Sequence, residues 1–398
     1  MKFLHISDTH LGYQQYGLRE RVQDFFDVFK QALEIAKEEK VEFIIHTGDL
    51  FHTKRPDNEV LIQAIKLIKD VKIPIYAIEG NHDKEGHIRN SDSPLEILKE
   101  ATQMKIVRSA VQVNDSVSIF GLPHLTNHRL KMLSQEGKPI SKVLEELYRN
   151  AEVSKEFTIL MLHLEFKDMF PLAFLSHSDI PPMFDYVGIG HLHDRQEPIK
   201  DGDRYIVYPG STEYTQILEK GNVEKGIYLV ELERNKVKSI EFKPLNTRKI
   251  IKLRINNTNA EEIEKILKEI AEKYENEEKK VILKLVLERN ESLKDYERIL
   301  LKKDIERILE QNKIKDKFLH ISKEEEAIKN ITIEKELEEE PVEKMIISKE
   351  ELFNDMLSKI DDSQVRDRMA QIINMIESAE SEQDINQIIK DRQELFEF

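Results

Sequence analysis

The sequence predicts an α/β fold in which two packed β-sheets flanked by helices are followed by a small α+β domain and C-terminal helices. Short β-branched or aromatic runs bounded by Gly, Pro or Asp alternate with helical patterns up to about residue 240. All 13 glycines lie at or before Gly226, whereas the remainder is rich in Lys, Glu, Ile and Leu. Because glycine marks turns, the compact turn-rich part of the chain should be the first part. A length of 398 residues, at roughly 150 residues per domain, also indicates two or three units.

These shifts in composition divide the chain into three regions. We expect a first domain over residues 1–240 and a second over residues 247–330, where predicted strands and helices alternate. Residues 323–344 are dense in charge, show little apolar periodicity and are typical of a linker. Residues 348–398 then carry apolar side chains at helical spacing, but about fifty residues bury little on their own. We therefore expect residues 331–398 to be a linker and helices that dock onto another protein.

Hydrophobic periodicity places the individual elements. The strands expected in the first domain are 2–6, 41–45, 73–78, 117–122, 157–162, 186–190, 205–208 and 226–232. The helices expected there are 19–40, 57–70, 94–100 and 141–151, with Asp57 and Ser93 as N-caps of the second and third. In the second domain we expect strands at 250–255, 280–288 and 318–322 and helices at 259–274 and 293–311.

The helix expected at residues 57–70 carries apolar side chains on more than one stripe, at Val60, Leu61, Ile62, Ala64, Ile65, Leu67 and Ile68. Two interpretations are open. The helix is either fully buried, or one side packs on the sheet while another contacts a second copy of the chain in a homodimer.

Composition bounds the location of the protein and its chemistry. The sequence has neither a run of about 18 apolar residues nor a secretory leader, so we expect an intracellular protein that makes no membrane contact. It contains no cysteine, which leaves oxygen and imidazole ligands for any metal and favours manganese, magnesium or iron. The net charge of -15 argues against steering to nucleic acid by global charge. DNA binding would need a local basic patch, bound metal ions or a partner.

Polar clusters follow five of the predicted strands. They are Asp8 and His10, Asp49 and His52, Asn81, His82 and Asp83, His163, and His191 and His193. Ligands in α/β sheets bind outside the carboxyl ends of the strands, so all five clusters could face one site. Asp49 would lie at its centre.

Each of these residues also has an interpretation without function. His163 could be a core histidine, and Asp8, Asn81, His191 and His193 could belong to turns. Five such coincidences in order at strand ends favour a metal centre instead. The other histidines of the first domain have no place in this pattern, and we expect them to be structural or to lie at the surface: His5, His46, His87, His124, His128 and His177.

The order Asp-x-His, Gly-Asp, Gly-Asn-His-Asp, a single His and Gly-His-x-His resembles the calcineurin-like metallophosphoesterases over residues 1–215. That resemblance implies a four-layer metallophosphoesterase β-sandwich and a hydrolase with two divalent cations. The first cation would be bound by Asp8, His10 and His193, and the second by Asn81, His163 and His191. Asp49 would bridge them, because a carboxylate can bind two cations and an imidazole only one. His82 would donate a proton or steady the transition state, with Asp83 orienting its ring.

Within that superfamily, Gly48-Asp49-Leu50-Phe51-His52 replaces the Asp-Arg-Gly turn of protein phosphatases. Together with the Pro209–Glu213 turn and the trailing domain, this resembles the meiotic recombination eleven nuclease family, also called the SbcD family. One departure is Leu164, where many members have glutamine.

That resemblance implies a nuclease with two Mn²⁺ per subunit, single-strand endonuclease activity and 3′ to 5′ double-strand exonuclease activity. Its partners would be DNA, as duplex ends and single strands, a second copy of the chain, and an SMC-like coiled-coil ATPase bound through residues 345–398. It would act in the cytoplasm, associated with the nucleoid, in the repair of double-strand breaks. Residues 247–330 would cap the site and position DNA, His52 would contact the phosphate, and Tyr13 and Tyr16 would stack on nucleotides.

Two other classes stay open at this point. A phosphodiesterase for small molecules would share the metals but have little use for a capping domain. A scaffold without catalysis would usually lose ligands, and none is missing from the pattern.

Overall fold

The computed structural model describes residues 1–83, 93–170, 173–216, 223–255, 259–289 and 295–327. The described residues all belong to one compact unit, Met1–Ile333. The predicted linker and C-terminal helices lie outside the described residues, as does His87.

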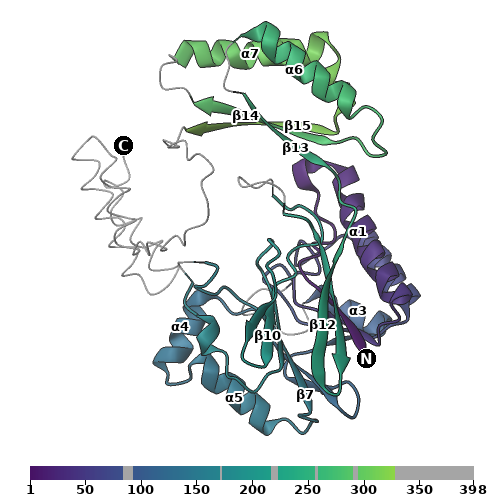
Figure 1. The fold of residues 1–398 in the computed structure, drawn as a ribbon, viewed down its shortest axis with the longest axis vertical. Coiled ribbons are helices and arrows are strands. Elements are labelled where there is room, and N and C mark those ends of the chain that lie inside the picture. Colours follow the sequence, from purple (N-terminus) through teal and green to yellow (C-terminus); the bar gives the residue numbers. More distant parts are fainter. Residues whose placement is uncertain (84–92, 171–172, 217–222, 256–258, 290–294, 328–398) are drawn as a thin grey trace, which may run out of the picture. The chain divides into compact units, whose positions relative to one another are not determined.

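Two six-stranded sheets form the first part of the chain (Figure 1). The first has the order β12-β11-β1-β2-β3-β4, with strands at Lys236–Pro244, Gly226–Glu233, Lys2–Ile6, Phe43–His46, Ile75–Ala77 and Met104–Ile106. The second has the order β5-β6-β7-β8-β10-β9, with strands at Ala110–Gln112, Val117–Leu122, Phe157–His163, Tyr186–Gly190, Arg204–Val207 and Ile199–Asp201.

Strands β1 to β4 run parallel to one another, and so do β6, β7 and β8. The central ones are buried along their whole length because they carry apolar side chains toward both faces. Their carboxyl ends therefore lie at one edge of each sheet.

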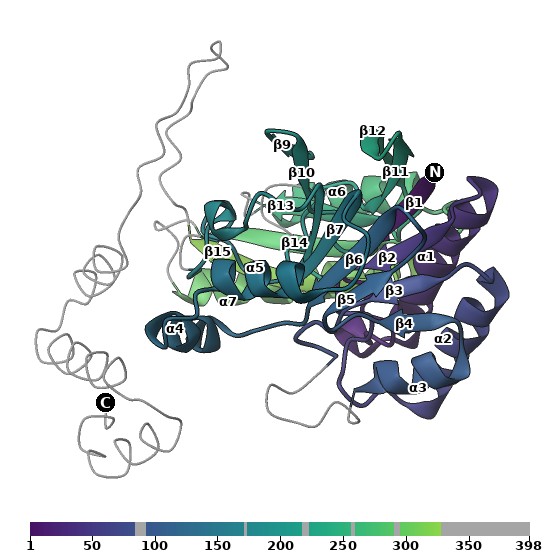
Figure 2. The same ribbon diagram turned by 90° about the horizontal axis from the view of Figure 1, so that it is seen from below.

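Helices cover the outer face of each sheet, giving four layers (Figure 2). The helices α1 (Arg19–Glu38), α2 (Asn58–Val71) and α3 (Pro94–Ala101) pack on the first sheet. The helices α4 (Asn127–Gln135) and α5 (Ile140–Asn150) pack on the second. Between the sheets lies an apolar core that includes Phe3, Phe43, Phe157 and Tyr186. The predicted four-layer β-sandwich is confirmed.

Several details differ from the sequence-based expectation. Ser93 accepts a hydrogen bond from the Leu95 amide as an N-cap, but Asp57 holds the N-cap position of α2 without a side-chain cap bond. The helix α4 and the strand β12 were not expected. β12 follows a hairpin turn at Arg234 and Asn235, both with positive φ, so the turn lacks the glycine that usually signals it. Because β12 pairs with β11 as far as Pro244, the sheet extends past residue 240.

The helix α2 is not fully buried. Val60, Ala64 and Ile68 face the core, whereas Ile62 is 52% exposed. Ile97 on the neighbouring helix α3 is 47% exposed. Of the two interpretations of the 57–70 helix, the one with a second apolar face agrees with this pattern.

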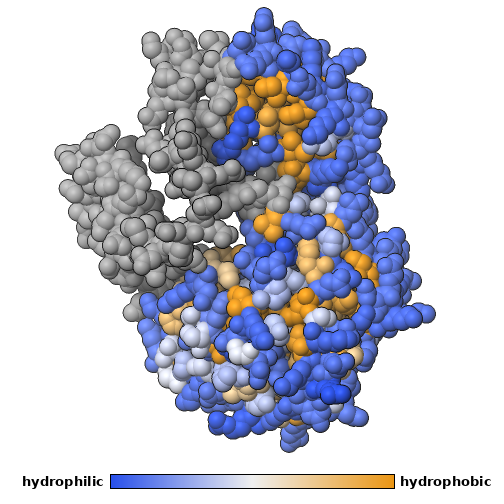
Figure 3. Space-filling view, viewed as in Figure 1, coloured by the Kyte–Doolittle hydropathy of each residue, from blue (hydrophilic) through white to orange (hydrophobic). Residues whose placement is uncertain are grey.

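A third sheet has the order β13-β14-β15, with parallel strands at Ile250–Ile255, Ile282–Arg289 and His320–Ala327. The helices α6 (Ala260–Lys273) and α7 (Asp295–Gln311) cover one face, and a separate core forms around Leu267, Leu285 and Ile308. In Figure 3 the outer surface of α6 and α7 is hydrophilic, and apolar residues gather beside the strands of this third sheet. We call residues 250–327 the C-terminal α/β unit. None of the helices in the described ranges combines the length and apolar content that a membrane span requires.

Candidate metal centre

Five strand ends bring the predicted site residues together. Parallel β1, β2 and β3 lead into the loops with Asp8, Asp49 and Asn81, while β7 ends at His163 and β8 leads to His191. The two sheets pack face to face, so these loops meet at one edge of the sandwich.

The first predicted ligand set is compact. One ligand atom from each of Asp8, His10, Asp49 and His193 lies within 4.8 Å of the others. The Nε2 atoms of His10 and His193 are 3.0 Å apart, and His193 Nε2 is 3.8 Å from Asp8 Oδ1.

The second predicted set converges on an amide oxygen. Asn81 Oδ1 lies 3.0 Å from His163 Nε2 and 3.0 Å from His191 Nδ1. Asp49 connects the two sets, since its Oδ2 is 3.5 Å from His163 Nε2 and 3.8 Å from His10 Nε2. Asp49 therefore lies where a bridging carboxylate is required.

Left-handed backbone is concentrated in these ligands. Asp8, His10, Asp49 and His191 have φ between 42° and 81°, although none is glycine. Such residues cost of order 1–3 kcal/mol each and cluster at functional sites. Glycine is required beside them: a Cβ on Gly80 would overlap Asp49 Oδ1.

Hydrogen bonds set the orientation of two imidazole rings. His163 Nδ1 donates to the Thr47 carbonyl at 2.8 Å, which points Nε2 toward Asn81 and Asp49 and leaves Nε2 a lone pair whenever the ring is neutral. His193 Nδ1 lies 2.6 Å from Thr215 Oγ1. With Nδ1 as the donor, His193 Nε2 also carries a lone pair into the site.

The charges of the buried groups suit cation binding. Burial lowers the pKa of His10 well below its usual value and the pKa of His193 to about 3, so both rings are neutral. Burial acts to raise the pKa of Asp49, but His163 and His10 outweigh it and hold that pKa well below its usual value. Burial likewise acts to lower the pKa of His163, yet Asp49 and Asp8 raise it to about 9. A bound cation would take the place of the proton on His163.

His52 and His82 lie beside the ligands. The His10, His52 and His82 rings form a second group of closely spaced nitrogen atoms. His82 Nδ1 donates to the His52 carbonyl at 2.8 Å, and the His82 amide donates to Asp49 Oδ1 at 2.8 Å.

One expectation about a neighbouring residue is wrong. Asp83 does not orient the His82 ring: its carboxylate accepts the amides of Leu50, Phe51 and Gly80 and so ties two site loops together. Tyr13 stacks on His52 and Tyr16 on His320, and stacking of these tyrosines on nucleotides stays a prediction.

Comparison with known proteins agrees with this geometry. The profile of the calcineurin-like phosphoesterase family matches residues 1–195. The chain is 33% identical over 301 residues to the DNA double-strand break repair protein Mre11 of Sulfolobus acidocaldarius, covering 72% of this chain and 75% of that protein. This chain belongs to the Mre11 family.

Other Mre11 proteins give similar values. The protein of Saccharolobus solfataricus is 28% identical over 98% of both chains. That of Methanocaldococcus jannaschii is 33% identical, covering 65% of this chain and 70% of that protein. A solved dimetal phosphatase of Danio rerio is 12% identical and covers 62% of this chain and 96% of that chain, with a TM-score of 0.41. Membership of the Mre11 family makes the chain a metal-dependent hydrolase of the nuclease type and confirms the family resemblance.

The donor set of this Mre11 family member fits divalent cations. In the first set the neutral rings of His10 and His193 converge with two carboxylates, and in the second the rings of His163 and His191 converge with an amide oxygen. The chain has no cysteine that could supply a thiolate. Without a cation or a proton between them, the facing Nε2 atoms of His10 and His193 would repel each other. Nitrogen and oxygen donors of this kind suit manganese, magnesium or iron.

Several residues of the site could not be predicted from the sequence. Glu165 accepts from His191 Nε2 at 3.1 Å and from Asn127 at 2.6 Å, which orients a predicted ligand. His124, expected to be structural or at the surface, stacks near His191 and donates to the His163 carbonyl. Lys225 is buried and donates to the His193 carbonyl at 2.6 Å. Single Glu, His or Lys residues carry no spacing signal, so only the fold reveals them.

The remaining histidines differ in their surroundings. His5 and His46 are buried and paired with Thr47 and Thr9, and burial lowers both pKa values to about 3. His128 is exposed, and His177 contacts Tyr208.

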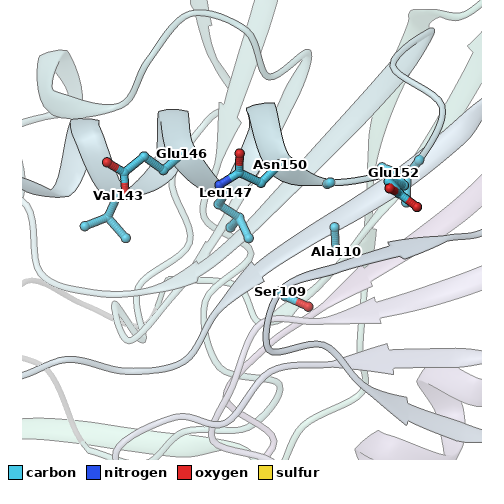
Figure 4. A pocket seen from close by; sticks show the side chains of 9 residues that line it. Ser109, Ala110, Val143, Glu146, Leu147, Asn150 and Glu152 are labelled. Atoms are coloured by element: carbon cyan, nitrogen blue, oxygen red, sulfur yellow. The ribbon is translucent and has the colours of Figure 1, made fainter.

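A pocket of about 310 Å³ opens on the candidate centre and is lined by Asp49, Asn81, His82, His193 and Lys225, among others. Another pocket, of about 550 Å³, lies apart from it between α5 and Ala110 at the start of β5 (Figure 4). Leu147 and the carboxylate of Glu146 are at this second pocket, and no histidine lines it. Chemistry on a phosphodiester therefore belongs to the first.

Proposed function

We propose that the chain is a manganese-dependent DNA nuclease that cuts single strands internally and degrades duplex ends from 3′ to 5′ at double-strand breaks. The observation that carries this proposal is the position of Asp49 between two ligand sets, with His52 and His82 beside them. Two divalent cations, when bound there, neutralise the phosphodiester and activate water. The ligand set is Asp8, His10, Asp49 and His193 for one Mn²⁺, and Asn81, His163 and His191 with Asp49 for the other.

Protein side chains position the phosphate and supply the proton for the leaving oxygen. His82 is held through Nδ1 by the His52 carbonyl and through its backbone amide by the Asp49 carboxylate, so Nε2 of the imidazolium form can protonate a leaving oxygen. His52 presents the phosphate of a duplex end.

We further propose that residues 247–330 cap the site and position DNA. On β13, residues that pack on the helices alternate with Lys252 and Arg254, which therefore lie on the opposite face of the sheet. Two basic side chains on one sheet face suit contact with phosphates. A chain with a net charge of -15 needs such a local group of basic residues to bind DNA.

The same proposal includes a homodimer and a complex with an ATPase. The exposed Ile62 and Ile97 on α2 and α3 favour a homodimer through these helices. An SMC-like coiled-coil ATPase would bind residues 345–398, outside the described residues. The predicted cytoplasmic, nucleoid-associated location accords with these partners and stays a prediction.

The test is a nuclease assay with manganese or magnesium on 3′-labelled duplex DNA and on circular single strands. We expect manganese to support both activities. A small chromogenic diester runs in parallel, and its cleavage without any DNA cleavage would favour a small-molecule phosphodiesterase. Calorimetry without manganese binding would favour a scaffold.

A further inference from the structure

A buried cluster of charged residues lies behind the first ligand set. Arg21 on α1 donates to Asp24 at 2.8 Å, to the Gln15 side chain at 2.9 Å and to the Tyr214 carbonyl at 3.0 Å. Its guanidinium is also 3.3 Å from Glu213. All of these side chains are shielded from solvent. Burying charges in this way is costly unless their geometry is fixed.

The cluster reaches the metal ligand His193 through one turn of the chain. Gln15 donates to the Thr215 carbonyl at 2.9 Å, while Arg21 holds the preceding carbonyl, that of Tyr214. Both carbonyls of this turn are thus fixed from α1 and the loop before it. The Thr215 hydroxyl then lies 2.6 Å from His193 Nδ1. The position of this hydroxyl decides the direction of His193 Nε2.

The cluster also holds the chain where it enters the C-terminal α/β unit. Arg248, two residues before β13, donates twice to Asp24, at 2.5 and 2.9 Å, and its amide donates to Glu213. It reaches the Lys280 carbonyl before β14 as well. Lys279 adds a contact of 3.2 Å to Asp24. Asp24 is therefore shared by Arg21, which supports the His193 turn, and by Arg248.

We propose that Gln15, Arg21 and Thr215 are positioning residues for the first-site ligand His193, and that Arg248 couples the seating of the C-terminal α/β unit to that ligand through Asp24. This inference rests on the proposed function, because His193 is a ligand only if the centre binds metal. The affinity of the first site for manganese should then depend on the hydrogen bonds between Arg248 and Asp24. The second set, on Asn81 and His163, has separate supports in Thr47 and Glu165.

The experiment measures manganese binding to the full chain by calorimetry and by the electron paramagnetic resonance of bound Mn²⁺. Gln15→Leu should weaken one of two manganese ions by roughly 10- to 100-fold, as loss of an outer-shell partner does. Gln23→Leu is the matched control, because Gln23 lies exposed on α1, where it makes hydrogen bonds with Asp27 and Gln63. It should bind both ions as the wild type does.

Thr215 provides a second pair of variants should Gln15→Leu fail to fold, which a thermal melt reports. Thr215→Val removes the hydroxyl and should weaken the same ion, and Thr215→Ser should restore it. Arg248→Lys keeps the charge but loses the two-point contact with Asp24, so it should weaken that ion as well. Asp27→Asn, which changes a surface partner of Lys279 and Gln23 and leaves the contact between Arg248 and Asp24 in place, is its control.

Two outcomes overturn the inference. In the first, folded Gln15→Leu and Thr215→Val bind both ions with wild-type affinity. In the second, both ions weaken equally, which indicates general loosening and no positioning of His193. Failure of the proposed function gives a different result, since the wild type itself would then bind no manganese.

Discussion

Tyr13 lies face to face with His52, with ring centroids 3.7 Å apart and an angle of 25° between the planes. His52 in turn stacks on His82, at 5.1 Å and 25°. Tyr13 also packs against Phe25, a fully buried residue of α1, so the stack begins on this helix. The three rings form one column beside the candidate metal centre.

This column predicts that Tyr13 controls the position of His52. His52→Ser should harm double-strand exonuclease activity more than single-strand endonuclease activity, because His52 presents a duplex end. Tyr13→Leu should show the same pattern more weakly, by roughly 2- to 10-fold, the value of an aromatic contact. Tyr13→Phe keeps the ring and serves as the control. Equal loss of both activities in His52→Ser would make His52 a general catalytic residue.

Asp49→Asn should disrupt both metal sites together. One neutral amide cannot bridge two cations as a carboxylate does. We expect calorimetry to show manganese affinity reduced by more than the roughly 10- to 100-fold that loss of an outer partner costs. Asp70→Asn, at an exposed carboxylate on α2, should bind manganese normally. Two ions bound to Asp49→Asn at wild-type affinity would refute the bridging role.

His82→Asn separates binding from chemistry. The structure holds His82 through its Nδ1 and its backbone amide, and we assign it no metal. The variant should keep manganese and DNA affinity while turnover falls by roughly 10² to 10⁴, the usual contribution of a positioned acid. His128→Asn, at an exposed histidine, is the control. Normal turnover in His82→Asn, or loss of metal, would contradict the proton-donor role.

Much of this centre could be predicted because its signals are local in sequence. The end of a run of apolar residues marks the end of a buried strand in the sequence. The polar residues that follow, such as Asp8 and Asn81, must then meet at the edge of the sheets where the parallel strands end. The residues that hold the predicted ligands in place could not be predicted in the same way. Thr215 and Gln15 are 200 residues apart in the chain, and their hydrogen bond exists only because the sheets pack.

The errors in predicted elements have physical causes as well. The strand β12 alternates charged and apolar residues at a sheet edge, and its turn at Arg234 and Asn235 adopts positive φ without glycine. Asp83 lies next to His82 in sequence, which suggested contact. Its side chain points instead to two backbone amides of the Asp49 loop and one of its own loop.

Truncation after Lys344 tests the partner proposal. The apolar residues of the last fifty positions recur at helical spacing, and such helices commonly fill a groove on another protein. The shortened chain should fold, dimerise and keep manganese-dependent nuclease activity, but lose the SMC-like ATPase and ATP-stimulated processing of duplex ends. A pull-down paired with a thermal melt decides. Retained binding with a lower melting temperature would mean that the helices only stabilise residues 1–330.

Ile62→Glu tests the proposed homodimer. Ile62 and Ile97 are apolar, about half exposed and carried by two helices in contact with each other, so they offer a surface that a second copy can cover. A buried, unpaired carboxylate in that interface is costly, and sedimentation should therefore show a monomer where the wild type is a dimer. Met132→Glu changes another exposed apolar side chain, at 38% exposure on α4, and should leave the dimer intact. Because the metal ligands lie on other elements, monomeric Ile62→Glu should still bind two manganese ions and cut single strands. A dimeric Ile62→Glu variant, or dissociation by Met132→Glu to the same extent, would place the subunit contact elsewhere.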